Sequence, residues 1–259
     1  MAEASNHGRY VWHELMTPDV NAAGVFYSAV VGWTVEPWKS DGADVLYWSF
    51  MDGQRPAAGM MRVPDAMAGA PPAWIAYVEV DDIDTTVDQA MSLGATVVAP
   101  ARTMPGVGRF AALRDPQGAT FAAITSERKL EPEADPKPLE FSWHELATDD
   151  WKAAEAFYSA LFGWKKQSEF DMGAMGMYSM FGRDRFTYGG MMNRTADMPP
   201  AQWIHYAAVP DADAAAERAK AAGGQVMMGP TEVPGGDRIA ILADPQGAPF
   251  AVHSKAGAK

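Results

Sequence analysis

The tetrapeptide Trp-His-Glu-Leu occurs twice in this chain, at residues 12–15 and again at residues 143–146. A histidine beside a carboxylate is a frequent pair in general acid–base catalysis and in metal binding. Neither copy continues into His-Glu-x-x-His, so the helical zinc motif of metalloproteases is excluded. The alternation of residue types instead predicts two strands, on which Trp and Glu point to one face and His and Leu to the other.

The duplication extends well beyond these four residues. VWHELMTPDVNAAGVFYSAVVGW at 11–33 matches SWHELATDDWKAAEAFYSALFGW at 142–164, and PGVGRFAALRDPQGATF at 105–121 matches PGGDRIAILADPQGAPF at 234–250. A repeat this long indicates duplicated domains rather than a solenoid. The charged, proline-rich stretch ERKLEPEADPKPL at 127–139 predicts an exposed linker. The sequence therefore predicts one module at 1–126 and a second at 140–259.

Each module shows the same order of expected elements. The strand that contains Trp12 leads to Asp19, which predicts a helix N-cap, and apolar residues at helical spacing follow. Strand patterns come next, and a second helix is expected from Asp82 to Leu93, with Gly94 ending it. The pattern predicts a unit of one strand, one helix and three strands. This unit occurs twice in each module, which indicates an α+β fold.

Composition narrows the classes of function. The chain has 259 residues, 48% of them hydrophobic and 21% charged, as in an ordinary globular protein. A net charge of −12 argues against binding to nucleic acid or to an anionic membrane. The absence of cysteine excludes disulfides, thiolate metal ligands and a cysteine nucleophile. No apolar run is long enough to span a membrane and the N-terminus lacks a secretory signal pattern, so we expect a cytoplasmic protein.

The Asp-x₆-Phe-Tyr blocks that begin at Asp19 and Asp150, together with the Asp-Pro-Gln-Gly turns at 115–118 and 244–247, resemble the vicinal oxygen chelate superfamily. This superfamily includes glyoxalase I, bleomycin and fosfomycin resistance proteins and extradiol dioxygenases, and the resemblance covers nearly the whole chain. It implies two tandem modules, each a pair of βαβββ units whose curved mixed sheets enclose a cavity.

The resemblance also implies where a divalent metal would be held in the metal-using members. The corresponding positions are Trp12, Ile75 and Ala122 in the first module, and Trp143, Ile204 and Ala251 in the second. None of these side chains offers the imidazole, carboxylate or amide oxygen that a divalent cation needs, so we expect no metal and no cofactor. An alternative is a non-standard site of His144, His205 and His253, which would require two local strand bulges.

Strand parity and the resemblance together predict which side chains line the cavities. The expected cavity residues are Trp12, Glu14 and Tyr77 in the first module, and Trp143, Glu145, Tyr206 and His253 in the second, with Trp48 and Tyr178 as further candidates. Each cavity would offer an aromatic stacking surface, one carboxylate and a phenol. The alternative is structural: the tryptophans fill the space of a ligand and the glutamates are tied to neighbouring groups. His13 and His144 are expected to be structural.

Two functions remain open on this basis. One is a small-molecule binder that stacks a planar apolar or aromatic ligand on Trp12 or Trp143, with Glu14 or Glu145 meeting a donor or cationic group. The other is a metal-independent lyase, isomerase or oxygenase-type enzyme in which Glu145 or Glu14 is the general base, with His253 as a further catalytic candidate. A scaffold with inert pockets is a third class. The modules are expected to pair with each other, in a monomer or a homodimer.

Overall fold

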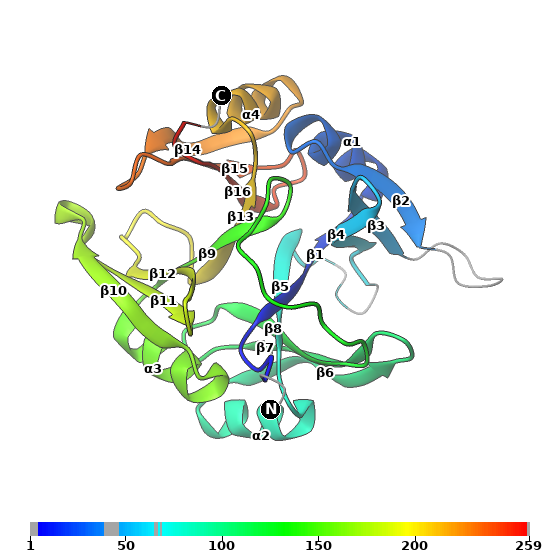
Figure 1. Ribbon diagram of the computed structural model, residues 1–259, viewed down its shortest axis with the longest axis vertical. Coiled ribbons are helices and arrows are strands. Elements are labelled where there is room, and N and C mark those ends of the chain that lie inside the picture. Colours follow the sequence, from blue (N-terminus) through cyan, green and yellow to red (C-terminus); the bar gives the residue numbers. More distant parts are fainter. Residues whose placement is uncertain (1–4, 39–46, 65–66, 68, 258–259) are drawn as a thin grey trace. The chain divides into compact units, whose positions relative to one another are not determined.

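The computed structural model describes residues 5–38, 47–64, 67 and 69–257. In these residues a βαβββ order occurs four times, as predicted (Figure 1). Each half of the duplicated sequence, called a repeat below, contains two of these βαβββ units. The first repeat consists of β1 (Tyr10–Thr17), α1 (Val20–Val30), β2 (Thr34–Trp38), β3 (Tyr47–Asp52), β4 (Arg55–Arg62), β5 (Ala73–Glu79), α2 (Ile83–Ser92), β6 (Thr96–Met104), β7 (Gly108–Arg114) and β8 (Thr120–Ser126). The second consists of β9 (Phe141–Thr148), α3 (Trp151–Phe162), β10 (Lys165–Asp171), β11 (Met177–Arg183), β12 (Phe186–Asn193), β13 (Gln202–Ala208), α4 (Ala212–Ala221), β14 (Gln225–Glu232), β15 (Arg238–Ala243) and β16 (Pro249–Ser254).

The strands form two eight-stranded sheets, one in each repeat. Their orders are β2-β3-β4-β1-β5-β8-β7-β6 and β10-β11-β12-β9-β13-β16-β15-β14. β1 and β4 run parallel, as do β5 and β8, whereas β3 and β4 are antiparallel, so the sheets are mixed. The predicted α+β class with two tandem modules of paired βαβββ units is confirmed.

Contacts divide the chain into two compact units that do not coincide with the two repeats. Unit one contains residues 1–11, 76–134 and 143–203, and unit two contains residues 12–75, 135–142 and 204–259. Each unit therefore combines one βαβββ element from the first repeat with one from the second.

In unit two, α1 and α4 lie side by side (Figure 1) and share one hydrophobic core. Asp19 caps α1, because its side chain accepts hydrogen bonds from the backbone N–H groups of Asn21 and Ala22. The core holds a group of aromatic rings with centroids about 5–6 Å apart, the usual spacing for edge-to-face and offset contacts: Phe26, Tyr27, Trp33, Phe50, Trp74 and Phe250.

Unit one is built in the same way from α2 and α3. Asp150 caps α3 and Asp82 caps α2, which spans the region predicted to be the second helix. The core again contains clustered aromatic side chains: Phe121, Phe157, Tyr158, Phe162, Trp164, Phe181 and Trp203. Burial of large aromatic faces makes these two cores the main source of stability.

The motifs that carry the family resemblance join the two halves of each unit. In unit two the Tyr27 hydroxyl donates to Asp244 Oδ2 at 3.2 Å and accepts from Trp74 Nε1 at 2.8 Å. In unit one Tyr158 donates to Asp115 Oδ2 at 2.9 Å. The Phe-Tyr and Asp-Pro-Gln-Gly motifs therefore hold the fold together and are not positioned for chemistry.

Arg109 and Arg238, which recur beside glycine-rich turns, each form an ion pair with an aspartate. Arg109 pairs with Asp84 at 2.7 Å, and Arg238 pairs with Asp213 at 2.6 Å. Both aspartates lie in the first turn of a helix. None of the helices in the described part of the chain combines the length and the apolar character needed to cross a membrane.

Candidate functional site

The first Trp-His-Glu-Leu copy lies on β1 in unit two and takes part in a small polar network. Trp12 Nε1 donates a hydrogen bond to the Tyr47 hydroxyl at 2.8 Å, and that hydroxyl donates to the Glu14 carboxylate. Trp12 and Tyr47 are half-buried and Glu14 is 9% exposed. The network therefore combines an indole, a phenol and a carboxylate at the protein–solvent boundary.

Gly59 on the neighbouring strand β4 leaves the space that the Tyr47 side chain occupies. Glu14 of β1 is in register with Gly59 of β4. A Cβ atom on Gly59 would lie 1.6 Å from the Tyr47 hydroxyl oxygen, so a side chain at this position cannot coexist with the observed ring. The missing side chain lets the phenol lie on the backbone of β4, beside the carboxylate.

The second copy, on β9 in unit one, forms the same network with Tyr178 of β11. Trp143 Nε1 donates to the Tyr178 hydroxyl at 2.8 Å, and Tyr178 donates to Glu145 Oε2 at 2.9 Å. Gly190 of β12 is in register with Glu145, and a Cβ on it would lie 2.0 Å from Tyr178 Cε1. The duplication has therefore kept the tryptophan, the glutamate, the tyrosine and the glycine together.

Electrostatics keep both phenols protonated. Burial raises the pKa of Tyr47 far above its ordinary value, and the negative charge of Glu14 raises it further. Burial and then Glu145 have the same effect on the pKa of Tyr178, and the hydrogen bond from Trp143 offsets it only in part. Each hydroxyl is thus a permanent donor to its glutamate, and one oxygen of that carboxylate is fixed in direction.

The other aromatic residues expected at the cavities have different surroundings. Tyr77, in unit one, is half-buried with its ring edge against Phe110, centroids 5.9 Å apart. Tyr206, in unit two, is 1% exposed. Trp48 packs against the hydrophobic core of unit two, so the adjacent Tyr47, on the other face of the strand, is the residue that joins Trp12.

Tyr47 was missed by sequence reasoning although the repeat contained the signal. The spacing that relates Trp12 to Trp143 also relates Tyr47 to Tyr178. Alternation along a strand then separates Tyr47 from Trp48. The duplication was enough to identify Tyr47, and not Trp48, as the equivalent of Tyr178, but it did not show the contact with Glu14.

His253, expected at the second cavity, has a polar partner on each ring nitrogen. It lies in unit two, with Nδ1 2.8 Å from Ser142 Oγ and Nε2 2.8 Å from Asp237 Oδ2. Both ring nitrogens are therefore already used in hydrogen bonds. This arrangement argues against the alternative in which His253 supplies a nitrogen to a three-histidine metal site.

The positions at which the resemblance implies metal ligands carry no donor that fits a divalent cation. Ile75 and Ile204 are each 6% exposed, and Ala122 and Ala251 are fully buried. Trp12 and Trp143 use their only polar atoms in hydrogen bonds to tyrosine. Hydrocarbon and indole side chains cannot replace imidazole or carboxylate, so the family's metal does not fit these residues.

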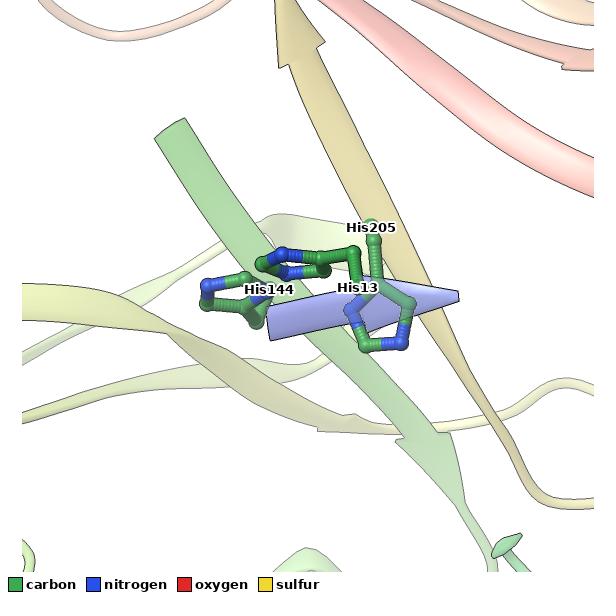
Figure 2. Close-up of side chains that lie close together, drawn as sticks. All are labelled: His13, His144 and His205. Atoms are coloured by element: carbon green, nitrogen blue, oxygen red, sulfur yellow. The ribbon is translucent and has the colours of Figure 1, made fainter. Parts of the chain in front are cut away.

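Three other buried histidines could each offer a ring nitrogen to a metal ion: His13, His144 and His205 (Figure 2). In unit two, His13 on β1 stacks on Phe141 with centroids 3.8 Å apart, and its ring is edge-on to His205 on β13 at 5.3 Å. In unit one, His144 on β9 lies 3.7 Å from the Tyr10 ring. Aromatic rings therefore pack against His13 and His144.

Burial also controls the protonation of the pair in unit two. Desolvation lowers the pKa of His13 well below its ordinary value, and the nearby His205 lowers it further. Desolvation lowers the pKa of His205 to about 3. Both imidazoles are therefore neutral at physiological pH.

The chain therefore has two sheets of paired βαβββ units, and each repeat carries one tryptophan–tyrosine–glutamate network. A family model described as the Glyoxalase/Bleomycin resistance protein/Dioxygenase superfamily matches residues 140–252, and a Glyoxalase-like domain model matches residues 12–124. The chain belongs to this glyoxalase superfamily, as its sequence motifs predicted.

Relatives extend along nearly the whole chain. It is 35% identical to "Putative glyoxylase CFP32" of Mycobacterium tuberculosis, over 93% of this chain and 92% of the relative. It is 30% identical to anthracycline biosynthesis protein DnrV of Streptomyces peucetius, over 95% of this chain and 92% of that protein.

Solved structures share the fold at low sequence identity. A Mn(II)-bound glyoxalase from Novosphingobium aromaticivorans has a TM-score of 0.64 and 15% identity, and covers 97% of this chain and 83% of its own. The 2,2′,3-trihydroxybiphenyl 1,2-dioxygenase of Sphingomonas wittichii has a TM-score of 0.68 and 11% identity, with 96% and 90% covered. At such identities the likeness concerns the fold alone.

Proposed function

We propose that this chain binds a planar aromatic small molecule against Trp12 or Trp143, without the divalent metal used by other members of the family. The observation that carries the proposal is the duplicated network, in which the indole N–H is held by a tyrosine and that tyrosine fixes the glutamate. A fixed, half-buried indole supplies a stacking surface at little entropic cost. The adjacent carboxylate gives the ligand an orientation by accepting a hydrogen bond from it.

The name of one group of relatives suggests the ligand class to test first. DnrV of Streptomyces peucetius and DauV of a Streptomyces strain are named anthracycline biosynthesis proteins. A polycyclic aromatic compound of the anthracycline type would suit a stacking surface that lies beside a carboxylate. The ligand of this chain is thus proposed to be planar and aromatic, with a donor or cationic substituent.

Isothermal titration calorimetry with an anthracycline and a panel of smaller planar aromatics tests the proposal. We expect saturable binding, and Trp12→Ala or Trp143→Ala should weaken the affected site about tenfold. Met227→Ala is the control, because Met227 is 51% exposed on β14, a strand that carries no member of either network. Absence of binding by every compound, or equal effects of the three substitutions, would refute the proposal.

A metal-independent enzyme is the second candidate, and the hydrogen bond from Tyr178 to Glu145 favours it. That contact fixes one carboxylate oxygen, as a positioned general base requires. Glu145→Gln should then abolish turnover of a bound ligand while binding is retained, and Glu14→Gln tests the first repeat in the same way. A bound ligand that neither variant nor wild type converts would favour the binder.

A further inference from the structure

Unit two contains a chain of three polar side chains that the tryptophan–tyrosine–glutamate network does not use. Ser142 Oγ lies 2.8 Å from His253 Nδ1, and His253 Nε2 lies 2.8 Å from Asp237 Oδ2. Ser142 Oγ also contacts the Tyr206 carbonyl oxygen, at the longer distance of 3.4 Å. A hydroxyl, an imidazole and a carboxylate linked in this order constitute the arrangement that activates a serine nucleophile.

The charge of Asp237 fixes the tautomer of the imidazole. Burial raises the pKa of Asp237, but hydrogen bonds from the Ala256 backbone N–H, from His253 and from Lys255 outweigh burial, and the pKa lies below its ordinary value. An ionised carboxylate only accepts hydrogen bonds, so His253 Nε2 carries a proton, and in the neutral imidazole Nδ1 is then the acceptor. Nδ1 faces Ser142, which can therefore donate its hydroxyl proton.

The fold does not require this arrangement. In the first repeat, which forms the same βαβββ elements, the equivalent positions hold Val11, Ile124 and Gly108. Ile124 is buried at 6% exposure, so an apolar residue serves this position of the strand. Burial of polar groups costs free energy that apolar residues would avoid. A purely structural role therefore does not explain why the second repeat has a serine, a histidine and an aspartate at these three positions.

The geometry points to Ser142 as a nucleophile for acyl transfer from an activated carboxylic ester, with His253 as its general base and Asp237 as the positioning residue. Ser142 Oγ attacks the carbonyl carbon while its proton passes to His253 Nδ1. The ester C–O bond breaks and the leaving alcohol takes that proton, which leaves an acyl-serine. Water then loses a proton to the same nitrogen and attacks the acyl-serine, and the serine hydroxyl recovers the proton as the acid leaves.

A fluorophosphonate probe applied to the full-length protein tests the nucleophile directly. We expect one adduct per chain, located at Ser142 by peptide mass spectrometry, and no labelling of Ser142→Ala. Ser92→Ala is the matched control, because Ser92 is an exposed serine on α2 whose hydroxyl donates to the Gln89 carbonyl. An unlabelled wild-type chain, or an adduct at another serine, would overturn the inference, and neither result depends on the folding of a variant.

Hydrolysis of p-nitrophenyl acetate separates the roles of the other two groups. His253→Ala should lower kcat about a hundredfold, with the circular dichroism spectrum unchanged. Asp237→Asn should lower kcat and leave KM unchanged, because the ester does not touch this residue, whereas a merely structural effect would alter both. Labelling of Ser142 at the wild-type rate in folded His253→Ala protein would contradict the assignment.

Discussion

Tyr178 lies directly on Gly190, so closely that a Cβ on the glycine would come within 2.0 Å of the tyrosine ring. The ring is held there by two hydrogen bonds, one from Trp143 at 2.8 Å and one to Glu145 at 2.9 Å. The first repeat shows the same relationship between Tyr47 and Gly59. The glycine therefore leaves the space in which the tyrosine ring lies, and the ring position allows the tyrosine hydroxyl to donate a hydrogen bond to the glutamate.

Gly190→Ala should displace the Tyr178 ring and break the network. We expect a loss of about 1–3 kcal/mol in the free energy of unfolding, because the methyl group overpacks the site. Urea unfolding measures this loss, and calorimetry should show weaker binding at the second-repeat site. In a Tyr178→Ala background the same substitution should cost much less. If Gly190→Ala lowered the free energy of unfolding equally in wild type and in Tyr178→Ala, the clash of the methyl group with the Tyr178 ring would be refuted.

Tyr178→Phe removes the hydroxyl and keeps the ring. The indole N–H of Trp143 then loses its acceptor, and we expect a loss of about 1–2 kcal/mol in the free energy of unfolding. A double-mutant cycle with Trp143→Phe isolates the interaction, and its coupling energy should be clearly different from zero. Strictly additive effects would mean that the hydrogen bond contributes nothing.

His205 should make stability depend on pH. Its folded-state pKa of about 3 lies below that of an unfolded histidine, about 6.5, so the unfolded chain binds the proton first as pH falls. Stability should therefore fall from about pH 6.5 downwards, and less so in His205→Gln. His7→Gln is the control, because this histidine side chain is 30% exposed. Urea titrations that show the same pH dependence in all three proteins would contradict the prediction.

Asp244 should act in the opposite direction. Burial raises its pKa above the ordinary value despite hydrogen bonds from the Ala248 and Gln246 backbone and from Tyr27. As pH rises past about 4, the Asp244 carboxyl ionises in the unfolded chain before it does in the folded protein, which stabilises the unfolded state relative to the folded state. The stability of the wild type relative to Asp244→Asn should thus decrease as pH rises from about 4 through the raised pKa. A difference in unfolding free energy that stays constant from pH 4 to 7 would contradict this.

Metal content tests the expectation that the family's cation is not used. Protein purified without a tag should contain much less than one equivalent of Zn, Fe, Mn or Ni by ICP-MS, because the positions of the family's ligands hold apolar and indole side chains. One equivalent of any of these metals would reverse the expectation. The variants His13→Ala, His144→Ala and His205→Ala would then show which buried imidazoles retain it.

Much of the fold could be predicted from the repeated sequence. The helix that begins after Asp19, the helix that begins after Asp82 and the βαβββ order all follow from local capping and periodicity, and the structure confirms them. Strand parity also placed Trp12 and Glu14 on one face, where both take part in the network with Tyr47. These features depend on neighbouring residues along the chain, which a sequence displays directly.

The partners of those residues depended on tertiary structure. Contact between Tyr47 and Glu14 requires two strands separated by a helix and another strand, and a glycine on a further strand to leave space for the ring. His253 on β16 likewise contacts Ser142 on β9 and Asp237 directly before β15, because the fold brings these separate segments together in unit two. The sequence by itself determined the repeat, the elements and the facing of Trp-His-Glu-Leu. Tertiary structure alone decided which hydroxyl each carboxylate and imidazole would meet, because such contacts join residues that no local pattern relates.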